Sequence, residues 1–178
     1  TDAAILLGAL VGLDPGDEAT SSSDGKYQTD YAQYLDANGL RGARIGVARQ
    51  FFGFHPGVTQ LMEEAVAEMK RQGAEIIDPA NIPTRGQFDE SEFEVLLYEF
   101  KADLNTYLSG LPDSVEYRTL ADLIEFNEQN KDRQMPHFGQ EIFLQAQEKG
   151  PLTDKAYLDA LGKNHRLSRD EGIDAGMN

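Results

Sequence analysis

Residues 43–79, ARIGVARQFFGFHPGVTQLMEEAVAEMKRQGAEIIDP, decide the fold of this chain. The short apolar run at residues 43–48 predicts a strand, and the spacing of apolar residues over Val58–Gln72 predicts an amphipathic helix. Gly73 stands where the glycine that ends a helix belongs, and Ala74–Pro79 predicts a second strand. Strand, helix and strand at this spacing predict a βαβ unit with parallel strands and a right-handed crossover. Because two strands alone do not make a stable parallel sheet, we expect further strands outside this chain.

The residues before this unit predict one helix, one polar loop and a short aromatic segment. The helix covers Asp2–Leu13 and ends at a turn that contains glycine and proline. Residues 17–25 are small and polar, which predicts a surface loop. Three tyrosines between residues 27 and 34 predict a short turn or helix that packs back on the core.

The chain from about residue 90 to residue 174 predicts helices. Asp89 or Ser91 could cap the first of them, which ends near Ser109. Its predicted apolar stripe consists of Phe93, Leu96, Leu97, Phe100, Leu104 and Leu108. The later predicted helices cover residues 120–127, with Thr119 as the cap, 139–147 and 153–174. The predicted fold class is therefore α/β, a largely helical chain with one βαβ unit over about residues 43–79.

The composition excludes several classes of partner and chemistry. The 178 residues include 31 acidic and 16 basic side chains, a net charge of -15 that repels nucleic acids and anionic membrane surfaces. No apolar run is long enough to cross a membrane. The chain has no cysteine, which excludes disulfides and thiol nucleophiles and leaves the compartment open, cytoplasmic or secreted.

Two histidine-containing features could suggest a metal or ligand site. His137 and Glu141 are four residues apart and would share a face of a helix, but no second histidine lies within ligand spacing. A solvated pair is the better interpretation. His55 follows the first strand, where ligand sites often form, although a single histidine there is more often structural. We predict no metal site.

Carboxylates and hydroxyls supply the other candidates. Glu99 and Asp103 are paired on the long helix, with Lys101 pointing elsewhere, and such pairs can act as acid and base. In so acidic a chain, a solvated helix face explains the pair better. The serines at 21–23 have no histidine or lysine in a suitable relation, so a flexible loop is the better interpretation. The residues alone predict no catalytic group, and the substrate-binding residues stay unknown.

Five stretches in the expected order resemble the amidase signature family. Asp2–Asp17 is similar to the helix and turn after that family's catalytic core, and Gly39–Val47 and Gly73–Ile77 are similar to its next two strands. Glu94–Leu108 resembles the long helix that follows in one bacterial branch, and Leu167–Asp174 resembles that branch's approach to a later strand. Together these stretches extend over nearly the whole chain.

This resemblance implies an α/β/α sandwich around a mixed sheet and the hydrolysis of carboxamide C–N bonds. The family uses a nucleophilic serine, a second serine in a cis peptide bond and a lysine, without a cofactor. All three belong to a core that precedes the equivalent of Thr1, and none matches a position here, so no catalytic residue is carried over. By the same analogy the helix Phe93–Leu108 is a candidate wall of the substrate pocket, although its stripe could equally be core.

We therefore expect residues 1–178 to be one fragment of an amidase, inactive alone. Its expected partners are the remainder of the amidase chain and, in the full enzyme, a small-molecule amide. The start at Thr1 without a methionine favours this expectation. Without the remainder of the enzyme, the fragment could self-associate through its exposed strand edges. The alternative is a free-standing acidic α/β module that binds a protein and catalyses nothing.

Overall fold

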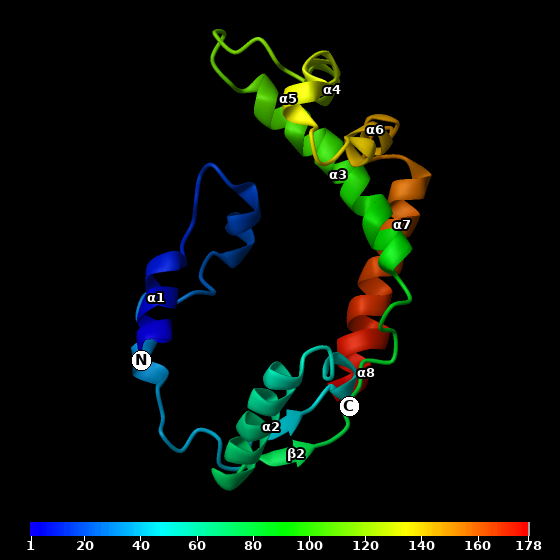
Figure 1. Ribbon diagram of the computed structural model, residues 1–178. Coiled ribbons are helices and arrows are strands. Elements are labelled where there is room, and N and C mark those ends of the chain that lie inside the picture. Colours follow the sequence, from blue (N-terminus) through cyan, green and yellow to red (C-terminus); the bar gives the residue numbers. More distant parts are fainter. Residues whose placement is uncertain (178) are drawn as a thin grey trace. The chain divides into compact units, whose positions relative to one another are not determined.

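The computed structural model describes residues 1–177, which form two compact units (Figure 1). The first unit is Thr1–Pro79 and the second begins at Ala80. The chain is an α/β protein, mostly helical, with one small parallel sheet, as predicted. Within the described residues no helix is long and apolar enough to span a lipid bilayer.

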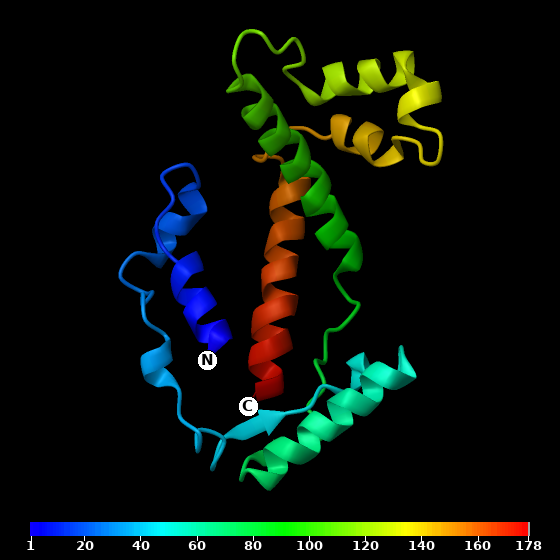
Figure 2. The same ribbon diagram turned by 60° about the vertical axis from the view of Figure 1, so that its left-hand side comes forward.

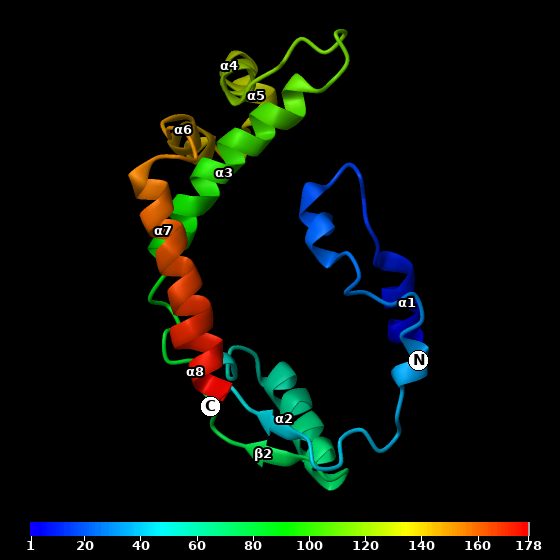
Figure 3. The ribbon, with the colours of Figure 1, turned by 180° about the vertical axis from the view of Figure 1, so that it is seen from behind.

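The first unit contains the predicted βαβ arrangement. Its elements are α1 (Asp2–Leu10), the 3₁₀ helices Glu18–Ser23, Ala32–Tyr34 and Arg49–Phe51, β1 (Arg44–Gly46), α2 (Pro56–Arg71) and β2 (Glu75–Ile77). The strands are parallel, with Ile45 opposite Ile76, and α2 lies alongside them (Figure 3). Among the described residues the sheet has only these two strands.

Local chemistry explains where α2 begins and ends. Pro56 occupies its first turn, where a missing N–H is harmless, and the preceding His55 ring accepts a hydrogen bond from the Val58 N–H at 3.4 Å. Gly73, with φ of +97°, turns the chain into β2, as the sequence predicted. The predicted apolar face is only partly covered: Val66 and Met69 are half-buried, whereas Leu61 is 67% exposed.

Two predictions for the N-terminal residues need correction. The first helix ends at Leu10 rather than Leu13, and the chain is already extended at Val11. The expected loop at residues 17–25 contains a 3₁₀ helix, Glu18–Ser23. Thr20 stabilises it, because its hydroxyl donates to the Asp17 carbonyl at 2.7 Å and accepts from the Asp14 N–H at 3.0 Å.

Arg49 joins the segments that follow the two strands. Its Nε donates to Asp78 Oδ1 at 2.8 Å, its guanidinium also pairs with Glu63 of α2, and it lies over the Phe52 ring. This hydrogen bonding holds the pKa of the Asp78 carboxyl below its usual range. The stabilisation is therefore present above the ordinary carboxyl pKa and is lost as the pH falls through the lowered pKa.

Replacing Arg49 by methionine is expected to loosen the sheet. The Val47 N–H, which donates to the Ile77 carbonyl at 2.9 Å, should lose hydrogen-exchange protection because Asp78 is no longer held. In the unchanged protein, protection factors at Val47 should fall on acidification as Asp78 is protonated. Arg71→Met is the matched control, because among residues 1–177 the Arg71 guanidinium pairs only with Glu68 of its own helix. Equal effects of the two variants would contradict this role for Arg49.

In the described part of the second unit, helices joined by loops are the only regular elements. Its elements are α3 (Asp89–Ser109), α4 (Leu120–Gln129), α5 (Lys131–Gln134), α6 (Glu141–Gln147), α7 (Lys155–His165), a π-helical stretch (Arg166–Ile173) and α8 (Asp174–Met177). The long helices α3 and α7 lie side by side, and α4 and α6 pack at the other end of α3 (Figure 2). The short helix α5 was not predicted from the sequence.

Helix α3 is buried on two sides, not along the one predicted stripe. One core contains Val95 and Tyr98 packed against Tyr157 and Ala160 of α7. The other core contains Leu97 of α3 with Leu120 of α4 and Ala146 of α6. Of the predicted stripe, Leu97 and Leu108 are buried and Leu104 is half-buried, while the remaining three are exposed: Phe93, Leu96 and Phe100.

The predicted caps of the second unit have different outcomes. Thr119 caps α4 as expected: its hydroxyl accepts from the Asp122 N–H at 3.2 Å, and the Asp122 carboxylate accepts from the Thr119 N–H at 2.9 Å. The prediction for α3 was wrong, because Phe88 precedes the helix and no side chain caps it. Ser91 instead donates its hydroxyl to the Phe88 carbonyl.

The predicted C-terminal helix is continuous but changes its winding. After His165 the chain widens into a π helix, which Thr84 braces by donating its buried hydroxyl to the Leu167 carbonyl at 2.6 Å. Gly172 lies against both of these residues. The π helix is rare and occurs mostly as a short insertion within an α-helix, so the sequence predicted an ordinary helix here.

Candidate functional site

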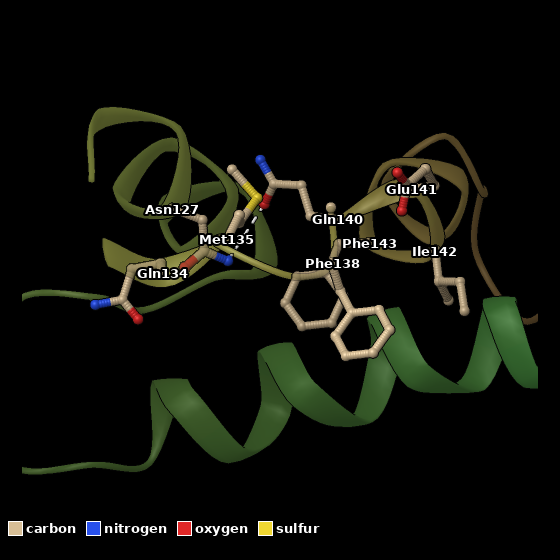
Figure 4. A pocket seen from close by; sticks show the side chains of 9 residues that line it. Asn127, Gln134, Met135, Phe138, Gln140, Glu141, Ile142 and Phe143 are labelled. Carbon is tan, nitrogen blue, oxygen red and sulfur yellow. Dashed lines mark hydrogen bonds between the residues drawn. The ribbon is translucent and has the colours of Figure 1, made fainter. Parts of the chain in front are cut away.

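A hollow of about 430 Å³ lies in the second unit, and its walls come from α4, α5, α6 and the loop at residues 135–140. Its apolar walls are Met135, Phe138, Ile142 and Phe143, and its polar walls are Asn127, Gln134, Gln140 and Glu141 (Figure 4). This volume is in the range of small-ligand pockets. This site was not predicted from the sequence. Its one local signal in the sequence is the aromatic residue Phe138, which lies between Pro136 and Gly139.

Two carboxamides organise the polar side of the hollow. The Asn127 amide donates to Gln140 Oε1 at 3.2 Å (Figure 4). The Gln140 amide donates to the Ile124 carbonyl, also at 3.2 Å. Both side chains are half-buried. The pair joins α4 to the residue just before α6 and fixes the orientation of both amide groups.

One wall residue of the hollow, Phe143, contacts helix α3. The Phe143 ring lies 5.3 Å from the Phe100 ring, centroid to centroid. Phe100 belongs to the same side of α3 as Leu96 and Phe93, which are exposed. One ring contact therefore joins the exposed side of α3 to a wall of the hollow.

Of the carboxylate pair predicted on α3, only Glu99 makes a structural hydrogen bond. Glu99 is half-buried and accepts a hydrogen bond from the Tyr157 hydroxyl at 2.8 Å, whereas Asp103 is exposed. This hydrogen bond, together with burial, raises the pKa of Tyr157. Glu99 thus fastens α7 to α3, and the expectation of a solvated face holds for Asp103 only.

Lys101 also has a structural position. Its ammonium donates to the Gln147 carbonyl at 2.8 Å and to the Lys149 carbonyl at 2.5 Å, at the end of α6. Lys149 in turn pairs with Glu94 at 2.7 Å beside the Tyr98 ring. Burial, and then the nearby Asp154, raise the pKa of Tyr98. These lysines hold the α6–α7 connection against α3 and are not free to act as bases.

The histidine candidates do not form a site. His137 lies in the loop before α6 and Glu141 is the first residue of that helix, so the two do not share a helix face as expected. His55 serves as the N-cap of α2, which is the structural role that the sequence analysis favoured. Among residues 1–177 no group of three or more potential metal ligands lies together.

Two of the serines at 21–23, Ser22 and Ser23, hydrogen-bond within their own 3₁₀ helix. The Ser22 hydroxyl donates to the Ala19 carbonyl at 3.0 Å, and the Ser23 hydroxyl donates to the Thr20 carbonyl at 2.7 Å. Lys26 does approach, but its ammonium donates to the Ser22 carbonyl at 2.8 Å. A basic group therefore contacts the backbone of this turn rather than a hydroxyl.

The chain matches known proteins over almost its whole length. The family model described as Amidase matches residues 1–173. A probable amidase of Arabidopsis thaliana is 36% identical over 176 residues, which are 96% of this chain and 33% of the plant protein. The resemblance stated from the sequence is thereby confirmed.

Solved structures give the same result. The native peptide amidase from Stenotrophomonas maltophilia superposes with a TM-score of 0.84 at 39% identity, over 98% of this chain and 35% of that one. A peptide amidase in complex with the competitive inhibitor chymostatin gives a TM-score of 0.86 at 40% identity, again over 98% and 35%. The chain spans about a third of the length of these relatives.

Proposed function

The chain belongs to the amidase family, and from this premise we propose that it supplies a structural and pocket-wall part of an amide-hydrolysing enzyme. In this proposal the serine nucleophile, the second serine and the lysine belong to another part of the enzyme, and residues 1–178 alone are inactive. The observation that carries the proposal is the large apolar surface left uncovered on elements that are otherwise well formed.

This surface is present in both units. Leu10 of α1 is 74% exposed, and Ile5 and Leu6 of the same helix are also exposed. The two-stranded sheet has one unpaired edge on each strand, where further strands can add. We propose that the remainder of an amidase chain covers these surfaces, and that without it the chain self-associates through them.

The α3 surface supports the pocket-wall part of the proposal. Phe93 and Leu96 belong to neither core of the second unit, and Phe100 contacts Phe143 at the edge of the second core. An apolar stripe that the core does not use is available to line a passage for an amide substrate. The other half of the stripe predicted from the sequence is buried or half-buried, namely Leu97, Leu104 and Leu108, so the proposed pocket wall is the exposed half only.

A segment exchange tests the proposal. Residues 1–178 replace the matching segment of the Stenotrophomonas maltophilia peptide amidase, and ammonia release is measured with a peptide amide as substrate. We expect the exchanged enzyme to be active, because the replaced segment has the same fold, and the enzyme lacking the segment to be inactive. The chain alone should release no ammonia.

Two outcomes would contradict the proposal. One is full activity of the enzyme that lacks the segment, since then the segment contributes nothing. The other is hydrolysis by the chain alone that disappears in Ser22→Ala, which would place a nucleophile in residues 1–178. Ser109→Ala is the control for the second outcome, because that hydroxyl also donates only to a carbonyl of its own helix.

A further inference from the structure

We propose that Asn38 is a site of self-modification, at which the Gly39 backbone nitrogen attacks the Asn38 side chain and converts it to aspartate and isoaspartate. The proposal concerns the turn before β1 in the first unit and does not depend on the proposed role in amide hydrolysis. It rests on three observations: the Asn–Gly sequence, the exposed carboxamide of Asn38, and the fixed surroundings of four further asparagines.

The first observation is the residue that follows Asn38. Of the asparagines in the chain, only Asn38 is followed by glycine. Glycine has no Cβ, so its nitrogen can approach the preceding side chain without steric hindrance, and its backbone reaches conformations that are closed to other residues. The attack closes a five-membered ring within one chain, and intramolecular attack of this kind is faster than attack by a separate molecule.

The second observation is the state of the Asn38 side chain. Asn38 and Gly39 are exposed, and within residues 1–177 the Asn38 carboxamide makes no hydrogen bond. The backbone around it forms a turn, in which the Asn38 N–H donates to Asp36 Oδ1 at 2.8 Å and the Gly39 N–H donates to the Asp36 carbonyl at 3.1 Å. The second of these bonds must open before the attack. It is a single bond of an exposed turn, and such turns open locally at a low cost in free energy.

The third observation concerns four further asparagines. Asn105, Asn127 and Asn164 lie within α-helices, whose hydrogen bonds fix the N–H of the residue that follows. Asn130 comes directly after α4, and its amide donates to a carbonyl of that helix at 2.9 Å. The chain therefore contains its own internal controls for the reactivity of Asn38.

The reaction needs only water as a co-reactant. A bond forms between the Gly39 nitrogen and Asn38 Cγ, the bond from Cγ to Nδ2 breaks, and ammonia leaves with the proton of the attacking nitrogen. The product is a cyclic imide, which water then opens at one of its two carbonyls. Opening at the former side-chain carbonyl gives aspartate. Opening at the main-chain carbonyl gives isoaspartate, in which the main chain continues through Cβ of residue 38.

The isoaspartate product changes the connection to the sheet. The Asn38 carbonyl accepts the Arg41 N–H at 2.9 Å, and the Gly42 N–H donates to the Gly73 carbonyl at 2.8 Å, just ahead of β1 and β2. In isoaspartate the main-chain carbonyl of residue 38 becomes a free carboxylate, so the turn loses its acceptor for Arg41. Both products also place a negative charge near Asp36. We therefore expect the Gly42 amide to lose hydrogen-exchange protection in the isoaspartate form.

Peptide mapping by mass spectrometry tests the proposal on the 178-residue chain. The chain is incubated at mildly alkaline pH, and the peptide that contains residue 38 is followed for the increase in mass when OH replaces NH₂. We expect conversion at a rate that rises with pH, since the attacking nitrogen must lose its proton. The peptides that contain Asn105, Asn127 and Asn130 should stay unchanged over the same time. Chromatography should separate two products, aspartate and isoaspartate.

Variants identify the reacting groups. Gly39→Ala keeps Asn38 but hinders the attack, so conversion should slow by about tenfold, which corresponds to a barrier higher by roughly 1.4 kcal/mol. Asn38→Gln should abolish conversion on this timescale, because the attack would have to close a six-membered ring. Gly162→Ala is the control, since a methyl group there meets nothing within 4 Å, and it should leave the rate at Asn38 unchanged. Circular dichroism checks that all three variants keep their helices.

Several results would overturn the proposal: no conversion at Asn38, equally fast conversion of the helical asparagines, or equal rates in Gly39→Ala and the unchanged chain. Formation of aspartate without isoaspartate would also do so, because it would indicate direct hydrolysis by water instead of attack by Gly39. The site releases at most one equivalent of ammonia per chain and needs no added amide. A blank without the peptide amide therefore separates this ammonia from enzymatic hydrolysis, and failure of this proposal leaves the proposed function standing.

Discussion

Replacing Leu120 by alanine is expected to lower the free energy of unfolding of the second unit by about 3 kcal/mol. Leu120 is 0% exposed, at the centre of the core that Leu97 and Ala146 complete. Truncation leaves a cavity where three helices meet, and Ala146 has no side chain long enough to fill it. Chemical denaturation followed by far-ultraviolet circular dichroism measures the loss.

The chain contains a matched control for this substitution. Leu158 of α7 is 53% exposed, so Leu158→Ala removes the same atoms from a site that is largely solvated already. Its effect should be within about 0.5 kcal/mol, as for most surface substitutions. If both variants lost the same stability, Leu120 would not be at the centre of a cooperative core.

The second large effect is expected at Gly172 in the π-helical stretch. A methyl group there would clash with the Leu167 carbonyl oxygen and lie 3.1 Å from the Thr84 hydroxyl. These are the two partners of the buried hydrogen bond that braces the π helix. Gly172→Ala should therefore destabilise the second unit by roughly 1–3 kcal/mol, the usual cost of overpacking, despite the better helix propensity of alanine.

Gly162→Ala should have the opposite effect on stability, because it should stabilise the second unit. Gly162 lies in α7, in the same continuous helical segment, and a methyl group there meets nothing within 4 Å. Alanine should stabilise the helix by about 0.5–1 kcal/mol, because it loses less conformational entropy than glycine on folding. Thermal denaturation of the two variants side by side makes the comparison. Equal shifts in one direction would mean that Gly172 is not tightly packed.

The parts of the fold that were predicted correctly depend on local patterns. The strand–helix–strand order around α2, the glycine at its end and the Thr119 cap each follow from residues within a few positions of one another. The short helix α5 and the π-helical stretch Arg166–Ile173 were missed, because neither has a distinctive local pattern.

The candidate site could not be predicted for a different reason. Its lining residues come from α4, α5, α6 and a loop, and only the packing of these elements brings Asn127 to Gln140 and Phe100 to Phe143. The candidates that the sequence did indicate, Glu99 and the serine turn, are occupied by structural hydrogen bonds. A sequence shows which groups are present, but not which of them are left free.

The sequence by itself determined the family and the α/β class, because the order of short motifs does not depend on packing. Only the tertiary structure decided which sides of α3 are core. Apolar residues surround much of that helix, so periodicity alone could not distinguish the faces covered by α4, α6 and α7 from the uncovered one. That choice depends on contacts between residues as far apart as Tyr98 and Tyr157, whose rings lie 5.5 Å apart in the folded chain.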